Sequence, residues 1–203
     1  MGTVTGTADA AADGRRARRE RNRAAVIDAM FELICDGHLP PAVGDVADRA
    51  GVSVSSVFRY FENLDDLQRE TIRRYFERYA ELFELPSAGE TTAERIAAYV
   101  DARLDLYETI GPIARLSRVR AADEPHLAET LAQTRRRFAE QVRSHFRADL
   151  AERRPADADD RAALIDALTS FESWDLLRRS HGRTRLRVRR AWVLGIQALL
   201  APS

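Results

Sequence analysis

The stretch from residue 42 to residue 61 constrains the fold more than any other part of the chain. It reads AVGDVADRAGVSVSSVFRYF and holds two short apolar repeats separated by a glycine. The repeats have the spacing of helix faces, and their apolar positions are Val46, Ala47, Ala50, Val57, Tyr60 and Phe61. Gly51 is expected to end the first helix, because glycine alone adopts a left-handed backbone without a steric penalty. Ser53 is expected to cap the second helix, so the stretch predicts two helices joined by a tight turn.

The second of these helices begins with small side chains. Its first turn holds Val54, Ser55 and Ser56, which are short enough to let a helix enter the major groove of DNA. A helix, a turn built on glycine and a second helix form a helix-turn-helix arrangement. An ordinary helical hairpin inside a bundle has the same spacing, so both interpretations stay open on spacing alone.

Helical periodicity continues over the rest of the chain, and no strand pattern appears. Of the 203 residues, 45% are hydrophobic, which is enough to bury a core. We therefore predict an all-α fold with about nine helices, in which a three-helix N-terminal domain precedes a larger helical domain. Two of the helices lie in the stretch above, and the others are expected at 19–35, 64–85, 91–111, 112–120, 126–152, 159–179 and 184–200. Residues 1–14 have no periodicity and are expected to form a disordered tail.

The charge pattern is local. The formal net charge is zero, with 32 basic and 32 acidic residues, so any basic surface for nucleic acid must come from a cluster. Residues 15–23, RRARRERNR, form such a cluster just before the first apolar helix, whereas acids outnumber arginines between residues 36 and 70. A run of this kind is commonly a solvated helix start. Next to a helix-turn-helix it is equally typical of a basic arm on DNA.

Other classes of protein find little support. The four histidines are scattered, no glycine-rich phosphate loop or nucleophile elbow occurs, and we expect no metal, no cofactor and no enzymatic activity. The single cysteine, Cys35, excludes an internal disulfide and is expected in the core. The N-terminus lacks the features of a secretory signal, and the longest apolar run, 191–201, is too short to span a bilayer. A cytoplasmic protein is expected.

The order of these motifs resembles the TetR family of one-component bacterial transcription regulators. The resemblance covers about residues 19–70 and rests on AGVS at 50–53, FRYF at 58–61, Asn63 and Leu67. It implies a helix-turn-helix DNA-binding domain at 15–68 and an effector-binding and dimerisation domain at 69–203. It also implies a homodimeric repressor that a small hydrophobic ligand releases from a palindromic operator. The alternative is a helical interaction module, or a DNA-binding regulator that responds to a protein partner and has no small effector.

The resemblance assigns residues to double-stranded DNA. The expected DNA-binding set is Arg15, Arg16, Arg18, Arg19, Val43, Gly44, Ser53, Val54, Ser55, Ser56, Arg59 and Tyr60. The chain departs from the family at Ala42, Phe58 and Leu64, where Thr, Tyr and Lys are usual. Each departure removes one group that would contact a phosphate. We therefore expect this protein to depend strongly on its arginine arm for affinity.

In the larger domain the assignments are coarser. Tyr99, Arg103 and Tyr107 share a helix face and are candidates to line an effector pocket with Phe138 and Phe171. The same helix face would also result if the two tyrosines packed in an ordinary hydrophobic core and the arginine were exposed. The family's dimer seam would be formed by the last two long helices, with candidate residues Trp174, Leu177, Trp192, Ile196 and Leu199. An intramolecular core is the alternative for this set.

Overall fold

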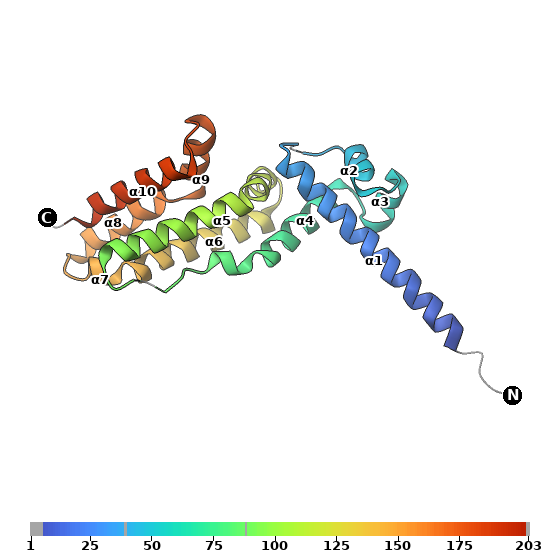
Figure 1. Ribbon diagram of the computed structural model, residues 1–203, viewed down its shortest axis with the longest axis horizontal. Helices are drawn as coiled ribbons and strands as arrows, with labels where there is room; N and C mark the ends of the chain where they lie inside the picture. The colour runs from blue at the N-terminus through green and yellow to red at the C-terminus, as the bar shows by residue number, and fades with distance from the viewer. Residues whose placement is uncertain (1–5, 39, 88, 202–203) are drawn as a thin grey trace. The chain divides into compact units, whose positions relative to one another are not determined.

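The computed structural model describes residues 6–38, 40–87 and 89–201, with side chains from residue 13 on except that of residue 15. The described residues are mainly helical, as predicted, and contain no strand. They form ten α-helices and two short segments, a 3-10 helix (η1) and a π-helix (η2) (Figure 1). The elements are α1 Gly6–Cys35, α2 Val43–Ala50, α3 Val54–Tyr60, α4 Leu64–Arg78, η1 Ala80–Phe83, α5 Thr92–Arg120, α6 Pro125–His145, α7 Arg147–Leu150, α8 Pro155–Leu168, α9 Phe171–Asp175, η2 Leu176–Ser180 and α10 Arg185–Leu200. No helix of the described part is both long enough and apolar enough to cross a membrane.

The chain divides into two compact units, unit 1 at Met1–Arg78 and unit 2 at Tyr79–Ser203. The division falls after α4, whereas the predicted domain boundary after residue 68 would cut this helix. Helix α4 belongs with α1 because Tyr75 stacks on Phe31, with ring centroids 3.5 Å apart, and donates a 3.0 Å hydrogen bond to Asp28. The first four helices therefore share one core.

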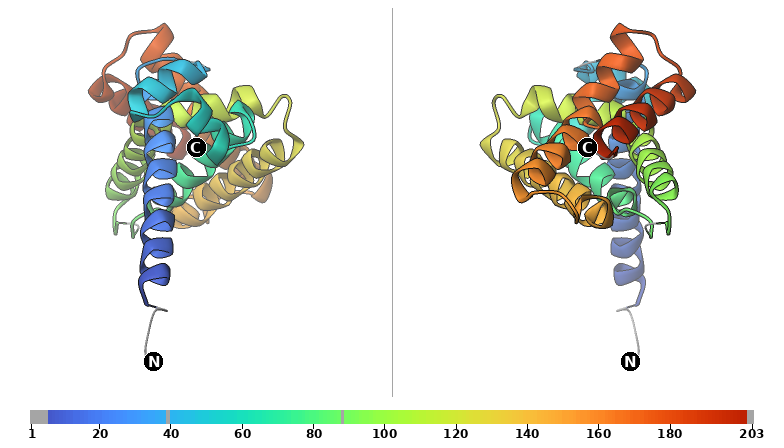
Figure 2. Two further views of the ribbon diagram at one scale, coloured as in Figure 1. Left: turned by 90° about the vertical axis from the view of Figure 1, so that its right-hand side faces the viewer. Right: turned by 90° about the vertical axis from the view of Figure 1, so that its left-hand side faces the viewer.

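Helix α1 begins at Gly6, well before the predicted start at Arg19. Residues 6–14, which were expected in a disordered tail, are thus helical, and residues 1–5 lie outside the described part. Its buried apolar side chains all fall in the C-terminal half, from Val26 to Ile34. The N-terminal half extends beyond α2, α3 and α4 (Figure 2). Cys35 is exposed at the end of α1, rather than in the core as expected.

The helix-turn-helix follows the local rules of the sequence. Gly51 ends α2 with a left-handed backbone at φ 67°, and its N–H bonds back to the carbonyl of Asp48 at 3.2 Å. Ser53 caps α3 by accepting a 3.2 Å hydrogen bond from the backbone N–H of Ser56. The apolar face predicted for the two helices is buried at Val46, Ala47, Val57 and Phe61. These contacts fix α3 on α1 and α2 and leave its other face outward.

Unit 2 is organised around α5, which packs against α6, α9 and α10 (Figure 1). Thr91 and Glu94 form the predicted capping box at its start. The predicted break at residues 111–112 does not occur, because α5 runs through Pro112 to Arg120. Buried Ile110, Ile113 and Leu116 on both sides of the proline keep α5 helical through this position. Local helix-breaking residues are outweighed here by tertiary packing.

The later helices are shorter than predicted. Helix α6 ends at His145, where Phe146 begins a bend into α7, and the single helix expected at 159–179 is divided into α8, α9 and the π-helical turn η2. A side-chain cap accounts for the separate start of α9, since Ser170 accepts a 3.1 Å hydrogen bond from Ser173 N–H. Thr184 likewise accepts from Arg187 N–H at 3.4 Å and begins α10 as expected.

The candidate dimer seam needs a correction. Trp174, Trp192 and Ile196 are buried inside unit 2, with 4%, 0% and 0% exposure. Tyr107 packs against both tryptophans, at 6.1 and 6.4 Å between ring centroids. These three side chains therefore form a core within one chain and leave no surface for a second copy. Leu177 and Leu199 are only partly buried.

Candidate nucleic-acid interface

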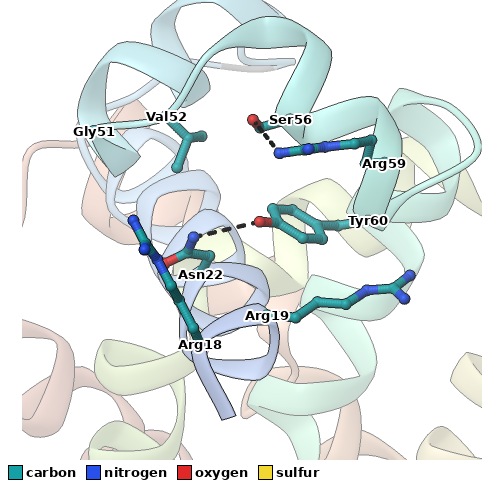
Figure 3. Close-up of a pocket in the computed structure, with 8 residues that line it drawn as sticks. All are labelled: Arg18, Arg19, Asn22, Gly51, Val52, Ser56, Arg59 and Tyr60. Carbon is teal, nitrogen blue, oxygen red and sulfur yellow. Dashed lines mark hydrogen bonds between the residues drawn. The ribbon is translucent and has the colours of Figure 1, made fainter. Parts of the chain in front are cut away.

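A basic pocket of about 680 Å³ lies between α1 and α3 (Figure 3). Helix α1 contributes Arg18, Arg19 and Asn22, the turn contributes Gly51 and Val52, and α3 contributes Ser56, Arg59 and Tyr60. The structure thus places the arginine arm and the start of the second helix of the motif against the same hollow. Five of the predicted DNA-binding residues line it, namely Arg18, Arg19, Ser56, Arg59 and Tyr60.

Asn22 connects the two helices, although it is not among the predicted DNA-binding residues. Its side-chain N–H donates a 3.3 Å hydrogen bond to the Tyr60 hydroxyl (Figure 3). Asn22 lies four residues after Arg18 and three after Arg19, so helical geometry places all three on neighbouring positions. That spacing was the available signal. The bond holds the Tyr60 hydroxyl at the pocket, where it can meet a phosphate.

A chain of hydroxyl groups orders the first turn of α3. Ser53 Oγ lies 2.9 Å from Ser55 Oγ and 3.0 Å from Ser56 Oγ. Arg59 donates a 2.8 Å hydrogen bond to Ser56 Oγ and meets no carboxylate among the described residues. Val54 is 40% exposed, so the outer face of this turn is open. The turn therefore presents short polar side chains, one valine and an uncompensated guanidinium.

Internal ion pairs engage some of the acids that are in excess between residues 36 and 70. Arg23 pairs with Glu70 at 3.1 Å and lies over the Phe61 ring at 5.0 Å, while Arg49 pairs with Asp36 at 3.0 Å. Hydrogen bonds from Arg73, and then from Arg23, lower the pKa of Glu70, so this carboxylate stays ionised as an internal counter-charge. Arg23 is thus part of the fold. Arg16, Arg18 and Arg19 are exposed and pair with no carboxylate in the described part.

The remaining predicted contacts are peripheral to the pocket. Val43 and Gly44 begin α2 and are partly buried. Ala42 before them supplies no side-chain cap, because a methyl group cannot accept a hydrogen bond. Arg16 lies further along α1 toward its N-terminus. The side chain of Arg15 lies outside the described residues.

Phe58 offers a test by gain of function. Its ring is 49% exposed on α3, one position before Arg59. In Phe58→Tyr the added hydroxyl would reach solvent on the outer face and could donate to a DNA phosphate. We expect DNA affinity to rise by about 2- to 10-fold, the range of one net hydrogen bond. Fluorescence anisotropy with labelled duplex measures this, and an unchanged or lower affinity at equal thermal stability would contradict it.

The candidate effector residues of unit 2 do come together. Arg103 is 1% exposed, donates to the Tyr99 hydroxyl at 3.3 Å and to Gln141 at 2.7 Å, and stacks on Phe138 with 3.9 Å to the ring centroid. Phe171 meets Tyr107 edge-on, with ring centroids 5.7 Å apart. Arg103 is thus buried rather than exposed. Burial raises the pKa of Tyr107, so that phenol stays neutral in the core.

The described residues contain no group of three or more His, Cys, Asp or Glu side chains arranged to hold a metal ion. The described surface around the α1–α3 pocket is instead formed by guanidinium, amide and hydroxyl groups. Such groups bind phosphate oxygens and base edges. The arrangement fits a polyanion.

Comparison with known proteins agrees with this chemistry. No family model matches the chain. The HTH-type transcriptional repressor LfrR of Mycolicibacterium smegmatis is 36% identical over 97 residues, which are 47% of this chain and 48% of that protein. The match therefore spans about half the length of this curated relative.

Solved structures extend the likeness over the whole fold. A transcriptional regulator from a Rhodococcus species superposes with a TM-score of 0.64 at 24% identity, over 90% of this chain and 95% of that one. A TetR-family transcriptional regulator from Streptomyces coelicolor gives 0.67 at 19% identity, over 89% of this chain and 80% of that one. At these identities the likeness is one of fold.

Proposed function

We propose that this chain, which has the fold of the TetR-family transcriptional regulators, is a sequence-specific DNA-binding repressor. The observation that carries the proposal is the pocket that Arg18 and Arg19 of α1 line together with Arg59 and Tyr60 of α3. The arginines and the tyrosine would hold phosphates, while Val54, Ser55 and Ser56 at the open start of α3 would meet base edges. The likeness to a named repressor over about half its length supports the same function.

The DNA-binding domain in this proposal ends with α4 at Arg78, where unit 1 ends. One recognition helix reads only a few base pairs, so we propose a homodimer on a palindromic operator. The surface leucines Leu164 on α8 and Leu186 and Leu194 on α10 are 53%, 73% and 66% exposed. Helices α8 and α10 pack together, and a contiguous apolar patch on such a pair is typical of a contact between subunits. They replace Trp174, Trp192 and Ile196 as the candidate seam.

The experiment is selection of duplexes from a random library by the full chain, followed by binding at several salt concentrations. The proposal predicts enrichment of one inverted repeat and binding by a dimer. A helical interaction module without DNA specificity predicts that no sequence is enriched, and that outcome would overturn the proposal. The variant Arg59→Gln tests sequence-specific binding further. It should weaken binding to the enriched site more than binding to a random duplex.

In the cell, we propose, this repressor acts in the cytoplasm without catalysing a reaction, and a small molecule bound in unit 2 releases it from DNA. Release requires that the ligand bind the two states of the protein with different affinity. Thermal shift detects such a ligand, because binding to the folded state raises the melting temperature. A regulator that responds only to a protein partner would show no rise in melting temperature with any small molecule.

A further inference from the structure

A second basic pocket, of about 570 Å³, lies entirely within unit 2. Its walls come from α5, from α9 and η2, and from the turn that leads into α10. The lining residues are Glu108, Pro112, Arg115, Trp174, Arg178, Arg179, Gly182, Arg183 and Thr184. Four of these nine are arginines and one is acidic. The volume is in the range of pockets that hold small organic ligands, about 300–1,000 Å³.

The negative charges near this pocket are already engaged. Asp175 accepts a 2.7 Å hydrogen bond from Arg115, and Glu108 accepts one of 2.8 Å from Arg185. Arg178 lies 3.8 Å from Glu108 and donates at 2.8 Å to the backbone carbonyl of Arg183. The local arginines therefore exceed the carboxylates that could balance them.

Two of the lining arginines have no counter-charge. The side chains of Arg179 and Arg183 are exposed and meet no carboxylate among the described residues. The turn holds their backbones in place, because Gly182 is left-handed at φ 59° and Arg183 N–H bonds to the Leu177 carbonyl at 2.9 Å. They approach the pocket from η2 and from the turn, so an anion between them could meet both. A π-helical turn such as η2 is itself frequent at functional sites.

The pocket also has an apolar side. Pro112 and the indole of Trp174 form part of its wall, and the Arg115 guanidinium lies 5.6 Å from the centroid of that indole. Trp174 is 4% exposed, and its ring N–H has no acceptor among the described residues. The wall thus offers a flat apolar surface to a ligand.

We propose that this pocket binds a small organic anion, with a carboxylate or phosphate head between Arg179 and Arg183 and a flat apolar body against Pro112 and Trp174. Guanidinium groups bind such heads through charge-assisted hydrogen bonds. The site is distinct from the Tyr99–Arg103 cluster named above. As the effector site of a repressor it rests on the proposed function, but binding of the anion itself requires no DNA.

Calorimetric titration of the full chain in the absence of DNA tests this pocket. The probe is 2-naphthoate, compared with the uncharged 2-naphthamide and with inorganic phosphate, which has a head but no apolar body. We expect naphthoate to bind at least tenfold more tightly than either. Equal binding of the amide would overturn the role of the arginines, and equal binding of inorganic phosphate would overturn the apolar part.

A pair of matched variants locates the site. Arg179→Gln with Arg183→Gln should weaken naphthoate binding at least tenfold, which corresponds to 1.4 kcal/mol. Arg187→Gln with Arg190→Gln removes the same charge from exposed positions of α10 that do not line the pocket, and should leave binding unchanged. No binding to the wild-type chain, or equal losses in both variants, would overturn the proposal. Either result leaves the DNA-binding proposal as it stands, since the titration contains no DNA.

Discussion

Replacing Arg16, Arg18 and Arg19 together by glutamine is expected to lower DNA affinity about a hundredfold near physiological salt. Each phosphate contact that is lost should reduce the slope of log K against log salt by about 0.9, so three should reduce it by about 2.7. The expectation follows from the structure because these three arginines are exposed on α1, and two of them line the α1–α3 pocket. Anisotropy titrations between about 50 and 200 mM salt provide both quantities.

Glutamine and arginine have similar helix propensities, so α1 should remain helical in this variant. The matched control replaces Arg154, Arg187 and Arg190 in unit 2, which are also exposed and pair with no carboxylate in the described part. It changes the net charge equally and should alter the slope little. If both triple variants lose affinity alike, the α1 arginines act only through net charge. If neither does, the arm contributes no contact.

The helix-turn-helix could be predicted from the sequence because short-range chemistry decides it. Gly51 and Ser53 act on backbone groups within a few residues of themselves, and the structure has both in the predicted roles. The acidic excess between residues 36 and 70 was also visible in the sequence, but the ion pairs that engage these acids were not. The pairing of Arg23 with Glu70 joins residues 47 positions apart, and no local pattern identifies such partners.

The parts that could not be predicted depend on what covers an apolar face. Proline at 112 argues for a helix end, yet burial on both sides of it maintains α5. Trp192 has the same helical spacing whether it packs on Tyr107 in its own chain or on a second chain, and only the fold shows that it packs on Tyr107. Helical periodicity indicates that a helix face is buried, but it does not indicate which helix or which chain covers that face. The same limit applies to Arg103, whose burial depends on Phe138 and Gln141 from another helix.

The second large effect concerns stability. Asp149→Ala is expected to reduce the free energy of unfolding of unit 2 by about 3 kcal/mol, the lower end of the cost of breaking a buried ion pair. Arg95 donates to both carboxylate oxygens of Asp149 at 2.8 Å, and Thr92 donates at 2.5 Å. The Asp149 side chain is only 4% exposed and that of Arg95 12%. The pair joins the start of α5 to α7, and Arg95 would stay buried without its counter-charge.

The control is Asp159→Ala, which removes a carboxylate paired with Arg143 at 3.3 Å, where the side chains are 70% and 51% exposed. A surface pair of this kind contributes about 0–1 kcal/mol. Denaturant unfolding followed by circular dichroism measures both variants. A loss at Asp149 no larger than that at Asp159 would show that the Arg95 pair contributes nothing beyond an ordinary surface contact.

The same carboxylate predicts a pH dependence with a definite sign. Hydrogen bonds from Arg95 lower the pKa of Asp149 in the folded state, whereas in the unfolded chain it should be near the ordinary value of about 3.9. The unfolded state therefore binds the proton first, so this stabilisation is complete above that value and is lost as the pH falls through the lowered folded-state pKa. Glu70, Glu94 and Glu172 also have lowered pKa values, so acid should destabilise the wild type through several groups. The difference between wild type and Asp149→Ala isolates one of them. That difference should shrink below about pH 4, and a difference that stayed constant with pH would show that Asp149 stabilises the fold without its charge.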